Sequence, residues 1–496
     1  MEQGQVKMSL RRRKAQGFVK AALSAKVLVS AISFLGVAVA IPSAPDVSAY
    51  DVSWATPSEH VPGGHYTDGM PLGNGATVVL AWANTTAGGL SFYVRHPHAQ
   101  HTDSTDFTLS RVTVGLSPNP FLTTSYFNQT HHLEDGSITI LAGGSGISSP
   151  AAVLRIYVDA NSDTVVVTAA AADGATPYSL AVLVDSVRPT HQNYTQEFYC
   201  FQSSYKPDVA GPLDLGAPPG SIAIRHENCV ACGDPDLFAF SVNQQGLAPA
   251  LPSPLPASPL DGRVFGVGAF GGAGADGSGA PLARNTGGTA LSSTAPAPAF
   301  VVHLCVRVEN ETPAQWEAGL ATQLAAAAAV PPTLRAAASA AWWTAFWGRS
   351  WITLPGFFGG SSSSNESQVA PQYARTRFIQ AAQSRGVSVP IKFNGMLYTT
   401  TGGSNGPLDV DSRDWGPDNC LSQGRTLREG TYRDGKPLTS PPHPRPFSRA
   451  QGGRTRACHT AQCLLRATTT HWPWCLTGRP PSSLWHLRGH GFCCRA

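Results

Sequence analysis

The chain has 496 residues, of which only 13% are charged, and it contains 50 glycines and 40 prolines. This composition favours a turn-rich β domain over a helical bundle. The net charge is +4, but the positive charge is concentrated at the two ends of the chain. Residues 1–49 carry +5 and residues 424–496 carry +10, which leaves −11 for residues 50–423. A mildly acidic body argues against a nucleic-acid-binding protein, and we expect no nucleic-acid partner.

Residues 1–49 are predicted to be a targeting segment. A basic stretch precedes an apolar run from Val27 to Ala40, and small residues that suit signal-peptidase cleavage follow. The run is shorter than the ~20 residues of a membrane helix, and no other segment approaches that length. We expect a cleaved signal peptide and a secreted or extracellular protein. The alternative is an uncleaved N-terminal anchor in the secretory pathway.

Glycosylation sequons and cysteines agree with export. The candidate N-glycosylation sites are Asn84, Asn128, Asn193, Asn310 and Asn365. Four cysteines, Cys200, Cys229, Cys232 and Cys305, lie in the body, and six more lie from Cys420 onward. The spacing Cys229-x-x-Cys232 favours a structural disulfide or free thiols. Zinc or redox chemistry is the other interpretation, but the body has no second paired-ligand motif.

Residues 50–310 read as an antiparallel β-sandwich. Short runs rich in β-branched and aromatic residues, such as "ATVVLAWA" and "DTVVVTAA", are separated by Gly, Asn, Asp and Pro. "SRVTVGL" alternates as a half-buried strand does. Residues 246–299 are low in large apolar residues and predict mostly a flexible surface insertion, in which "SPLDGRVFG" (Ser258–Gly266) is a less random stretch. "FVVHLCVRV" then predicts a final strand.

The pattern changes to helical after Asn310. Residues 311–358 predict a helical linker in which Trp342 with Phe346, and Trp343 with Trp347, are i, i+4 pairs. We expect these aromatics to pack on the β domain rather than to form a sugar platform. After a Gly- and Ser-rich loop, Ala374, Phe378, Ala381 and Ala382 share one face of an amphipathic helix, and Gly386 is placed to cap it.

Several segments together resemble the six-hairpin glycosidases, nearest to the fucosidase-like branch. They are "MPLGNG", "FTLSRVTVGLSPNPF", "SPLDGRVFG", "AWWTAFWGRSWI", "RFIQAAQSRGVSVPIKFNGMLYT" and "DSRDWGPDN". The resemblance covers about residues 50–419, and within that branch it is similar to secreted proteins whose N-terminal domain has no assigned function. It implies a mainly β protein followed by α structure, in which residues 359–419 begin an (α/α)6 barrel.

The resemblance also implies hydrolysis of an O-glycosidic bond in an oligosaccharide or polysaccharide, without a cofactor. Such a reaction uses one carboxylic acid and a second group that activates water. In this branch those groups come from the barrel, but the family-like sequence stops at Asn419. A barrel of twelve helices needs on the order of 300 residues. We therefore expect a truncated barrel and no hydrolase activity, and we identify no general acid or base.

Residues 420–496 are rich in Arg, His, Pro, Cys and Trp and show no helical or strand period. We expect a tail that is disordered or mistranslated, and our hypothesis for its origin is out-of-frame or intron-derived translation. The alternative is a basic interaction tail.

Four polar or aromatic residues are candidates for substrate contact: Lys392, Asn394, Asp414 and Trp415. A Trp face stacks on a sugar ring, and the polar groups can bind hydroxyls. Turn formation by Asn394 and burial of Trp415 are the alternatives. Asp68, which precedes "MPLGNG", and Asn74, which lies within it, are candidates for a domain interface, although a turn at Asn74 and Gly75 also explains that sequence.

A second segment, "RHPHAQHTDSTD", contains His96, His98, His101 and Asp103. It matches no zinc spacing, so we expect a solvated loop and no metal site.

The resemblance, together with the targeting segment and the sequons, implies a secreted glycoside hydrolase-like glycoprotein of carbohydrate metabolism that is inactive because its barrel is truncated. The alternative is a noncatalytic secreted β-sandwich module that binds glycans or cell-wall components.

Overall fold

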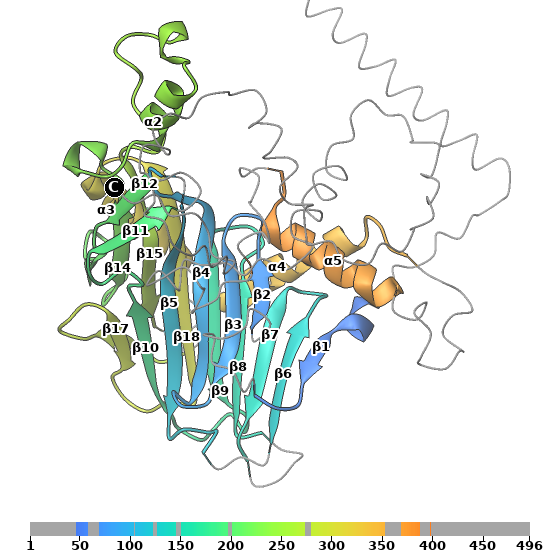
Figure 1. Ribbon diagram of the computed structural model, residues 1–496. Helices are drawn as coiled ribbons and strands as arrows, with labels where there is room; N and C mark the ends of the chain where they lie inside the picture. The colour runs from blue at the N-terminus through green and yellow to red at the C-terminus, as the bar shows by residue number, and fades with distance from the viewer. Residues whose placement is uncertain are drawn as a thin grey trace, which may run out of the picture. The chain divides into compact units, whose positions relative to one another are not determined.

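A computed structural model describes residues 46–57, 69–103, 105–122, 126–144, 150–196, 201–272, 279–352, 369–386 and 397 (Figure 1). The predicted β-sandwich is present as two antiparallel sheets that pack face to face (Figure 1). The first sheet has seven strands, in the order β16 (Leu282–Arg284), β17 (Ala290–Ser293), β10 (Ser179–Asp185), β5 (Asp106–Ser117), β4 (Gly89–Gln100), β3 (Val78–Asn84) and β2 (Met70–Gly73).

The second sheet has nine strands. Their order is β1 (Val52–Trp54), β6 (Phe127–His132), β7 (Ser137–Ala142), β8 (Ala152–Val158), β9 (Thr164–Ala171), β18 (Ala299–Asn310), β15 (Arg263–Gly271), β14 (Ile222–Glu227) and β13 (Val209–Pro212). A separate hairpin pairs β11 (Gln192–Gln196) with β12 (Phe201–Tyr205). The described part also contains the short helices η1 (Val47–Tyr50), η3 (Val230–Cys232), α2 (Leu237–Gln244) and η4 (Ala248–Ala250).

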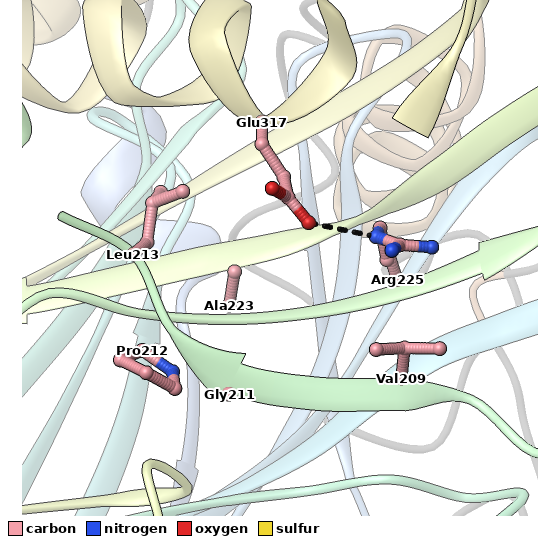
Figure 2. Close-up of a pocket in the computed structure, with 7 residues that line it drawn as sticks. All are labelled: Val209, Gly211, Pro212, Leu213, Ala223, Arg225 and Glu317. Carbon is pink, nitrogen blue, oxygen red and sulfur yellow. Dashed lines mark hydrogen bonds and ion pairs between the residues drawn. The ribbon is translucent and has the colours of Figure 1, made fainter. Parts of the chain in front are cut away.

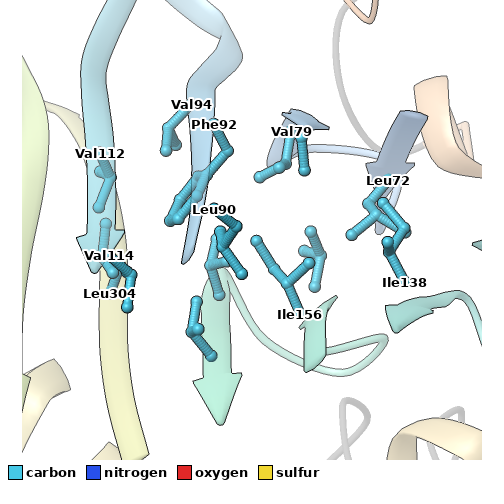
Figure 3. Close-up of a cluster of buried hydrophobic side chains, with 14 of the residues drawn as sticks. Leu72, Val79, Leu90, Phe92, Val94, Val112, Val114, Ile138, Ile156 and Leu304 are labelled. Atoms are coloured by element: carbon cyan, nitrogen blue, oxygen red, sulfur yellow. The ribbon is translucent and has the colours of Figure 1, made fainter. Parts of the chain in front are cut away.

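The core lies between the two sheets and follows from period-2 alternation. In β5, Val112, Val114 and Leu116 are buried while the residues between them are more exposed, as the sequence predicts. Figure 3 shows side chains of β2–β5 meeting Ile138, Ile156 and Leu304 of the opposite sheet. Burying this apolar surface is the main force that holds the sheets together.

Helix α3 (Pro313–Ala328) covers the outer face of β15 and β18. It begins with a capping box, in which Thr312 accepts a hydrogen bond from the backbone of Gln315 and the Gln315 side chain accepts one from the backbone of Thr312. Trp316, Leu320 and Leu324 then pack on the sheet. This second layer explains why β15 is buried on both faces rather than alternately.

The range 246–299 differs from its prediction as a flexible insertion. It contains β15, a central strand, as well as β16 and β17. The glycines that made it look unstructured permit close packing: a Cβ on Gly268 would lie 2.8 Å from Cδ2 of Leu320 on α3. A small residue is needed where the helix approaches the strand.

Helices α4 (Pro332–Trp347) and α5 (Val369–Gln383) follow, as the sequence predicts. Helix α5 buries Ala374, Phe378, Ala381 and Ala382, which are the residues of the predicted apolar face. Gly386 has a positive φ of 79°, but it lies three residues after Gln383, the last residue of the helix, and its N–H donates to Oγ of Ser384 rather than to a helix carbonyl, so it is not the cap itself. The rest of the predicted barrel segment lies outside the described residues, apart from Leu397.

Candidate functional site at the α5 docking surface

The loop between β2 and β3 receives the C-terminal end of helix α5. The backbone N–H of Gly75 donates a hydrogen bond to the carbonyl of Ala382, at 3.0 Å. This bond satisfies one of the carbonyls that a helix end leaves without an intrahelical partner. A Cβ on Gly73 would lie 2.4 Å from the same oxygen, so the sequence "PLGNG" permits the backbone of α5 to approach the sheet.

Asn74 fixes the shape of this loop. Its Oδ1 accepts hydrogen bonds from the backbone N–H groups of Ala76 and Thr77, at 3.0 and 2.8 Å. Its Nδ2 donates to the carbonyl of Ser162, at 2.8 Å, and to Oδ1 of Asp163, at 3.2 Å. Asn74 therefore forms the predicted turn and also joins that turn to the β8–β9 loop. Asp68, the other predicted interface residue, lies outside the described residues.

A buried ion pair connects the β8–β9 loop to helix α4. The Arg335 Nη1 lies 2.9 Å from Oδ2 of Asp159, and the two side chains are only 8% and 5% exposed. Arg335 also donates to the carbonyl of Ala327, and the backbone N–H of Ala160 donates to Oγ of Ser339. Because a buried charge needs a partner and hydrogen bonds, this network holds α4 in one orientation on the sandwich.

The aromatic face of α4 packs on the sandwich, as its i, i+4 pairs predict. Trp343 and Trp347 are buried, and Nε1 of Trp347 donates to the carbonyl of Leu133, at 2.8 Å. Phe378 of α5 stacks on Trp343 with ring centroids 4.9 Å apart and meets His131 of β6 edge-on. Helices α4 and α5 and strand β6 therefore share one apolar cluster.

Arg385 adds a further contact between the end of α5 and both α4 and the β8–β9 loop. Its guanidinium lies 3.4 Å from the ring centroid of Trp342, and its Nη1 donates to the carbonyl of Ala160, at 2.6 Å. Burial, and next the charge of Arg349, lower the pKa of Arg385 to about 10. The arginine remains charged at neutral pH, and its stacking covers Trp342, which a sugar platform would need uncovered.

We call these parts together the α5 docking surface: the Gly73–Thr77 loop, the Asp159–Asp163 loop and the aromatic face of α4. Its polar groups bind one another and the backbone of the helices, so what the arrangement does is position α5. Sequence reasoning missed Asp159, Arg335 and Arg385. The only local signal for any of these residues was the sequence "DANSD" at 159–163, which is typical of a loop stabilised by Asx turns.

The predicted substrate contacts lie outside the described residues. Lys392 and Asn394 come shortly after Gly386, and Asp414 and Trp415 come later. The docking surface holds the helix that leads into them, and their role stays a prediction.

The histidine-rich segment is not the solvated loop that was expected. His96 and His98 belong to β4, and His101 and Asp103 are buried. The ring of His101 lies 3.2 Å from Asp103 and 3.7 Å from Asp234. Burial lowers the pKa of His101, but the two carboxylates outweigh it and the net shift is upward. Pairing of His101 with these two carboxylates explains how the three charged groups can be buried. Among the residues that the structure describes, no group of His, Cys, Asp and Glu is arranged to hold a metal ion.

A small cavity lies between the edge strand β13 and helix α3 (Figure 2). Its volume is about 150 Å³, and Arg225 and Glu317 at its border are paired with each other at 3.0 Å. Ligand pockets usually have volumes of about 300–1,000 Å³. The size and the paired charges do not favour this cavity as a sugar site.

The sequons differ in their surroundings. In Asn84 and Asn310, both the oxygen and the nitrogen of the side-chain amide are hydrogen-bonded. Asn84 donates to Oγ of Ser91 and accepts from the backbone N–H of Ala87. Asn310 accepts from Nε of Arg263 and donates to the carbonyl of Pro259. Asn128 lies in β6, where its Oδ1 accepts a hydrogen bond from Thr130 of the same sequon. Asn193 lies in β11. Asn365 lies outside the described residues.

Within the described ranges, no helix is both long and apolar enough to cross a membrane.

Comparison with known proteins gives a family without an assigned function. No curated protein matches the chain. A solved structure described as a candidate kojibiose phosphorylase from the human microbiome aligns with 70% of this chain and 43% of its own, at 11% identity and a TM-score of 0.41. The chain thus spans less than half the length of that protein. The family model described as "Domain of unknown function (DUF5703)" matches residues 53–352, from β1 to five residues beyond α4. The chain belongs to this family.

Proposed function

We propose that the chain is part of a carbohydrate-acting, glycosidase-like protein, and that its sandwich serves to seat the first helix of a helical domain. The observation that carries this proposal is the contact between Gly75 and Ala382. It fixes α5, the helix that opens the barrel-like part of the sequence resemblance, on the family domain. The sandwich then has a mechanical role, and carbohydrate chemistry belongs to the residues after α5.

The proposed reaction of the intact domain is hydrolysis of an O-glycosidic bond, as in the fucosidase-like branch. Lys392, Asn394, Asp414 and Trp415 are the proposed contacts to an oligosaccharide or polysaccharide. The polar groups would bind hydroxyls and the indole would stack on a sugar ring. We further propose that this polypeptide does not hydrolyse glycosides, because its family-like sequence stops at Asn419.

We propose that the protein follows the secretory route. The basic and apolar N-terminal segment and the sequons support this proposal. The Cys229–Cys232 disulfide also agrees with it, since disulfides persist in oxidising compartments.

A glycan array with the purified full-length chain tests the carbohydrate assignment. We expect oligosaccharide binding that is weakened by Gly73→Ala, which pushes α5 off the sandwich. Gly211→Ala is the matched control, because a Cβ there meets nothing within 4 Å. Binding that is unchanged in Gly73→Ala would instead support the alternative, a sandwich module that binds glycans by itself. Absence of binding by the wild-type chain would contradict both.

Aryl-glycoside assays of the same protein test the activity. We expect no turnover above a buffer control. Measurable turnover that Asp414→Asn reduces would contradict the proposed inactivity, and it would strengthen the carbohydrate assignment.

A further inference from the structure

The loop after β14 presents a disulfide at the surface. A disulfide joins Cys229 to Cys232, three residues later; Cys229 is the N-cap of the short helix η3 and Cys232 is its last residue. Cys232 is exposed, whereas Cys229 is half-buried. The two cysteines are therefore unequal in access, and Cys232 is the more exposed of the pair.

Hydrogen bonds hold this turn independently of the disulfide. The N–H groups of Cys232 and Asp234 donate to the carbonyl of Cys229, at 3.0 and 3.2 Å. In return, Oδ2 of Asp234 accepts from the N–H of Cys229 at 2.6 Å. The N–H of Val230 donates to Oδ1 of Asp261, at 2.8 Å. These bonds fix both ends of the turn without any contribution from sulfur.

The carboxylate that holds Cys229 is itself anchored from the interior. Asp234 is buried, and its Oδ2 lies 3.5 Å from Nζ of Lys206 and 3.7 Å from Nε2 of His101. His101 in turn contacts Asp103, whose Oδ2 accepts a hydrogen bond from the hydroxyl of Tyr205. Breaking the sulfur–sulfur bond removes none of these contacts.

A disulfide with a purely structural role ties together segments that would otherwise separate, and its stabilisation grows with the length of the loop that it closes. This one closes a very short loop that is already hydrogen-bonded. Cys-x-x-Cys pairs with one accessible sulfur are typical of thiol–disulfide exchange. Such exchange requires an accessible cysteine and a turn that does not depend on the disulfide, and both are present here.

We propose that Cys229–Cys232 is a thiol–disulfide exchange site that accepts two electrons from a dithiol while the sandwich stays folded. A thiolate of the dithiol attacks Sγ of Cys232, the bond between the two cysteine sulfurs breaks, and Cys229 leaves as the thiolate. The second thiolate of the donor then attacks its own sulfur in the mixed disulfide and releases Cys232. The donor ends as a disulfide, and the two cysteines, after taking up two protons, end as thiols. This inference does not depend on the proposed carbohydrate function.

Native-state reduction of the full-length protein tests the proposal. The protein is incubated with dithiothreitol without denaturant, its thiols are trapped with a maleimide, and labelled peptides are mapped by mass spectrometry. Cys305 is an internal control, because it is a free and fully buried thiol that reacts only when the sandwich opens. We expect full labelling of Cys229 and Cys232 and none of Cys305. A pair that stays oxidised until Cys305 is labelled would overturn the proposal.

Two single variants test the order of attack. With oxidised glutathione, Cys229→Ser leaves the exposed Cys232 thiol, and Cys232→Ser leaves the half-buried Cys229 thiol. We expect the mixed disulfide to form at least about tenfold faster in Cys229→Ser, because access controls the rate. Equal rates would contradict the assigned order of attack. The double serine variant should keep the wild-type circular dichroism spectrum, and loss of the β signal would show that the disulfide is structural.

Discussion

Replacing Gly73 by alanine should release helix α5 from the sandwich. The added Cβ would lie 2.4 Å from the carbonyl oxygen of Ala382 and 3.0 Å from its carbon. Since real Cβ contacts are essentially never shorter than 3.0 Å, the two backbones must separate by roughly 0.6 Å. The obstacle is backbone rather than the end of a flexible side chain, so no change of rotamer relieves it.

The expected loss of docking free energy for α5 has two contributions. Overpacking of a tight contact costs about 1–3 kcal/mol, and weakening the hydrogen bond from Gly75 to Ala382 costs about 0.5–1.5 kcal/mol. We expect the free energy of docking of α5 to fall by about 1.5–4.5 kcal/mol. This corresponds to roughly 10- to 2,000-fold faster exchange of its amides, because an undocked helix of this length is marginal in water.

Hydrogen exchange resolved by mass spectrometry measures this effect peptide by peptide. Exchange should accelerate in Val369–Gln383 of Gly73→Ala, while β5 and β18 keep their wild-type protection. Gly211→Ala controls for alanine substitution on a strand, because its Cβ points into open space. If α5 exchanges at the wild-type rate in Gly73→Ala, the loop does not seat the helix and the proposed role of the sandwich is wrong.

Three further changes probe the same region. Arg335→Met leaves Asp159 buried without its cation, and the free energy of unfolding measured in urea should fall by about 3–5 kcal/mol. Adding Asp159→Asn to the same chain removes the unpaired charge and should restore part of this loss. Trp347→Phe leaves the carbonyl of Leu133 without its donor and should cost about 1–3 kcal/mol, seen as a lower Tm; an unchanged Tm would show that the bond contributes nothing. His303 is buried, which together with the charge of Arg335 lowers its pKa to about 4 from an ordinary 6.5. Between pH 4 and 6.5 the unfolded chain therefore binds more protons at this histidine than the folded chain does. The free energy of unfolding should fall as the pH drops through this range, by up to about 1.4 kcal/mol per pH unit. His303→Phe should reduce this pH dependence in urea titrations, and an unchanged pH dependence would contradict the lowered pKa of His303.

Periodic patterns in the sequence predicted the fold where each residue's environment repeats along the chain. The alternation in β5 and the i, i+4, i+7 spacing of Ala374, Phe378 and Ala381 each reflect one buried face, and the structure confirms both. The prediction of a flexible segment was wrong for the second half of β15, a strand that is buried on both faces under α3. Its glycines follow from the approach of that helix, and no local pattern distinguishes such glycines from those of a flexible loop.

The docking surface could not be predicted for a related reason. Its contacts join residues that lie far apart in sequence: Gly75 with Ala382, Asp159 with Arg335, and Trp342 with Arg385 across an intervening loop. "PLGNG" predicts a turn, because Asn and Gly tolerate the required backbone angles. What the turn receives is decided by a helix that begins almost three hundred residues later. Gly73 does not have a positive φ, so the turn itself does not require glycine at this position. The absence of a side chain there instead permits the close approach of α5.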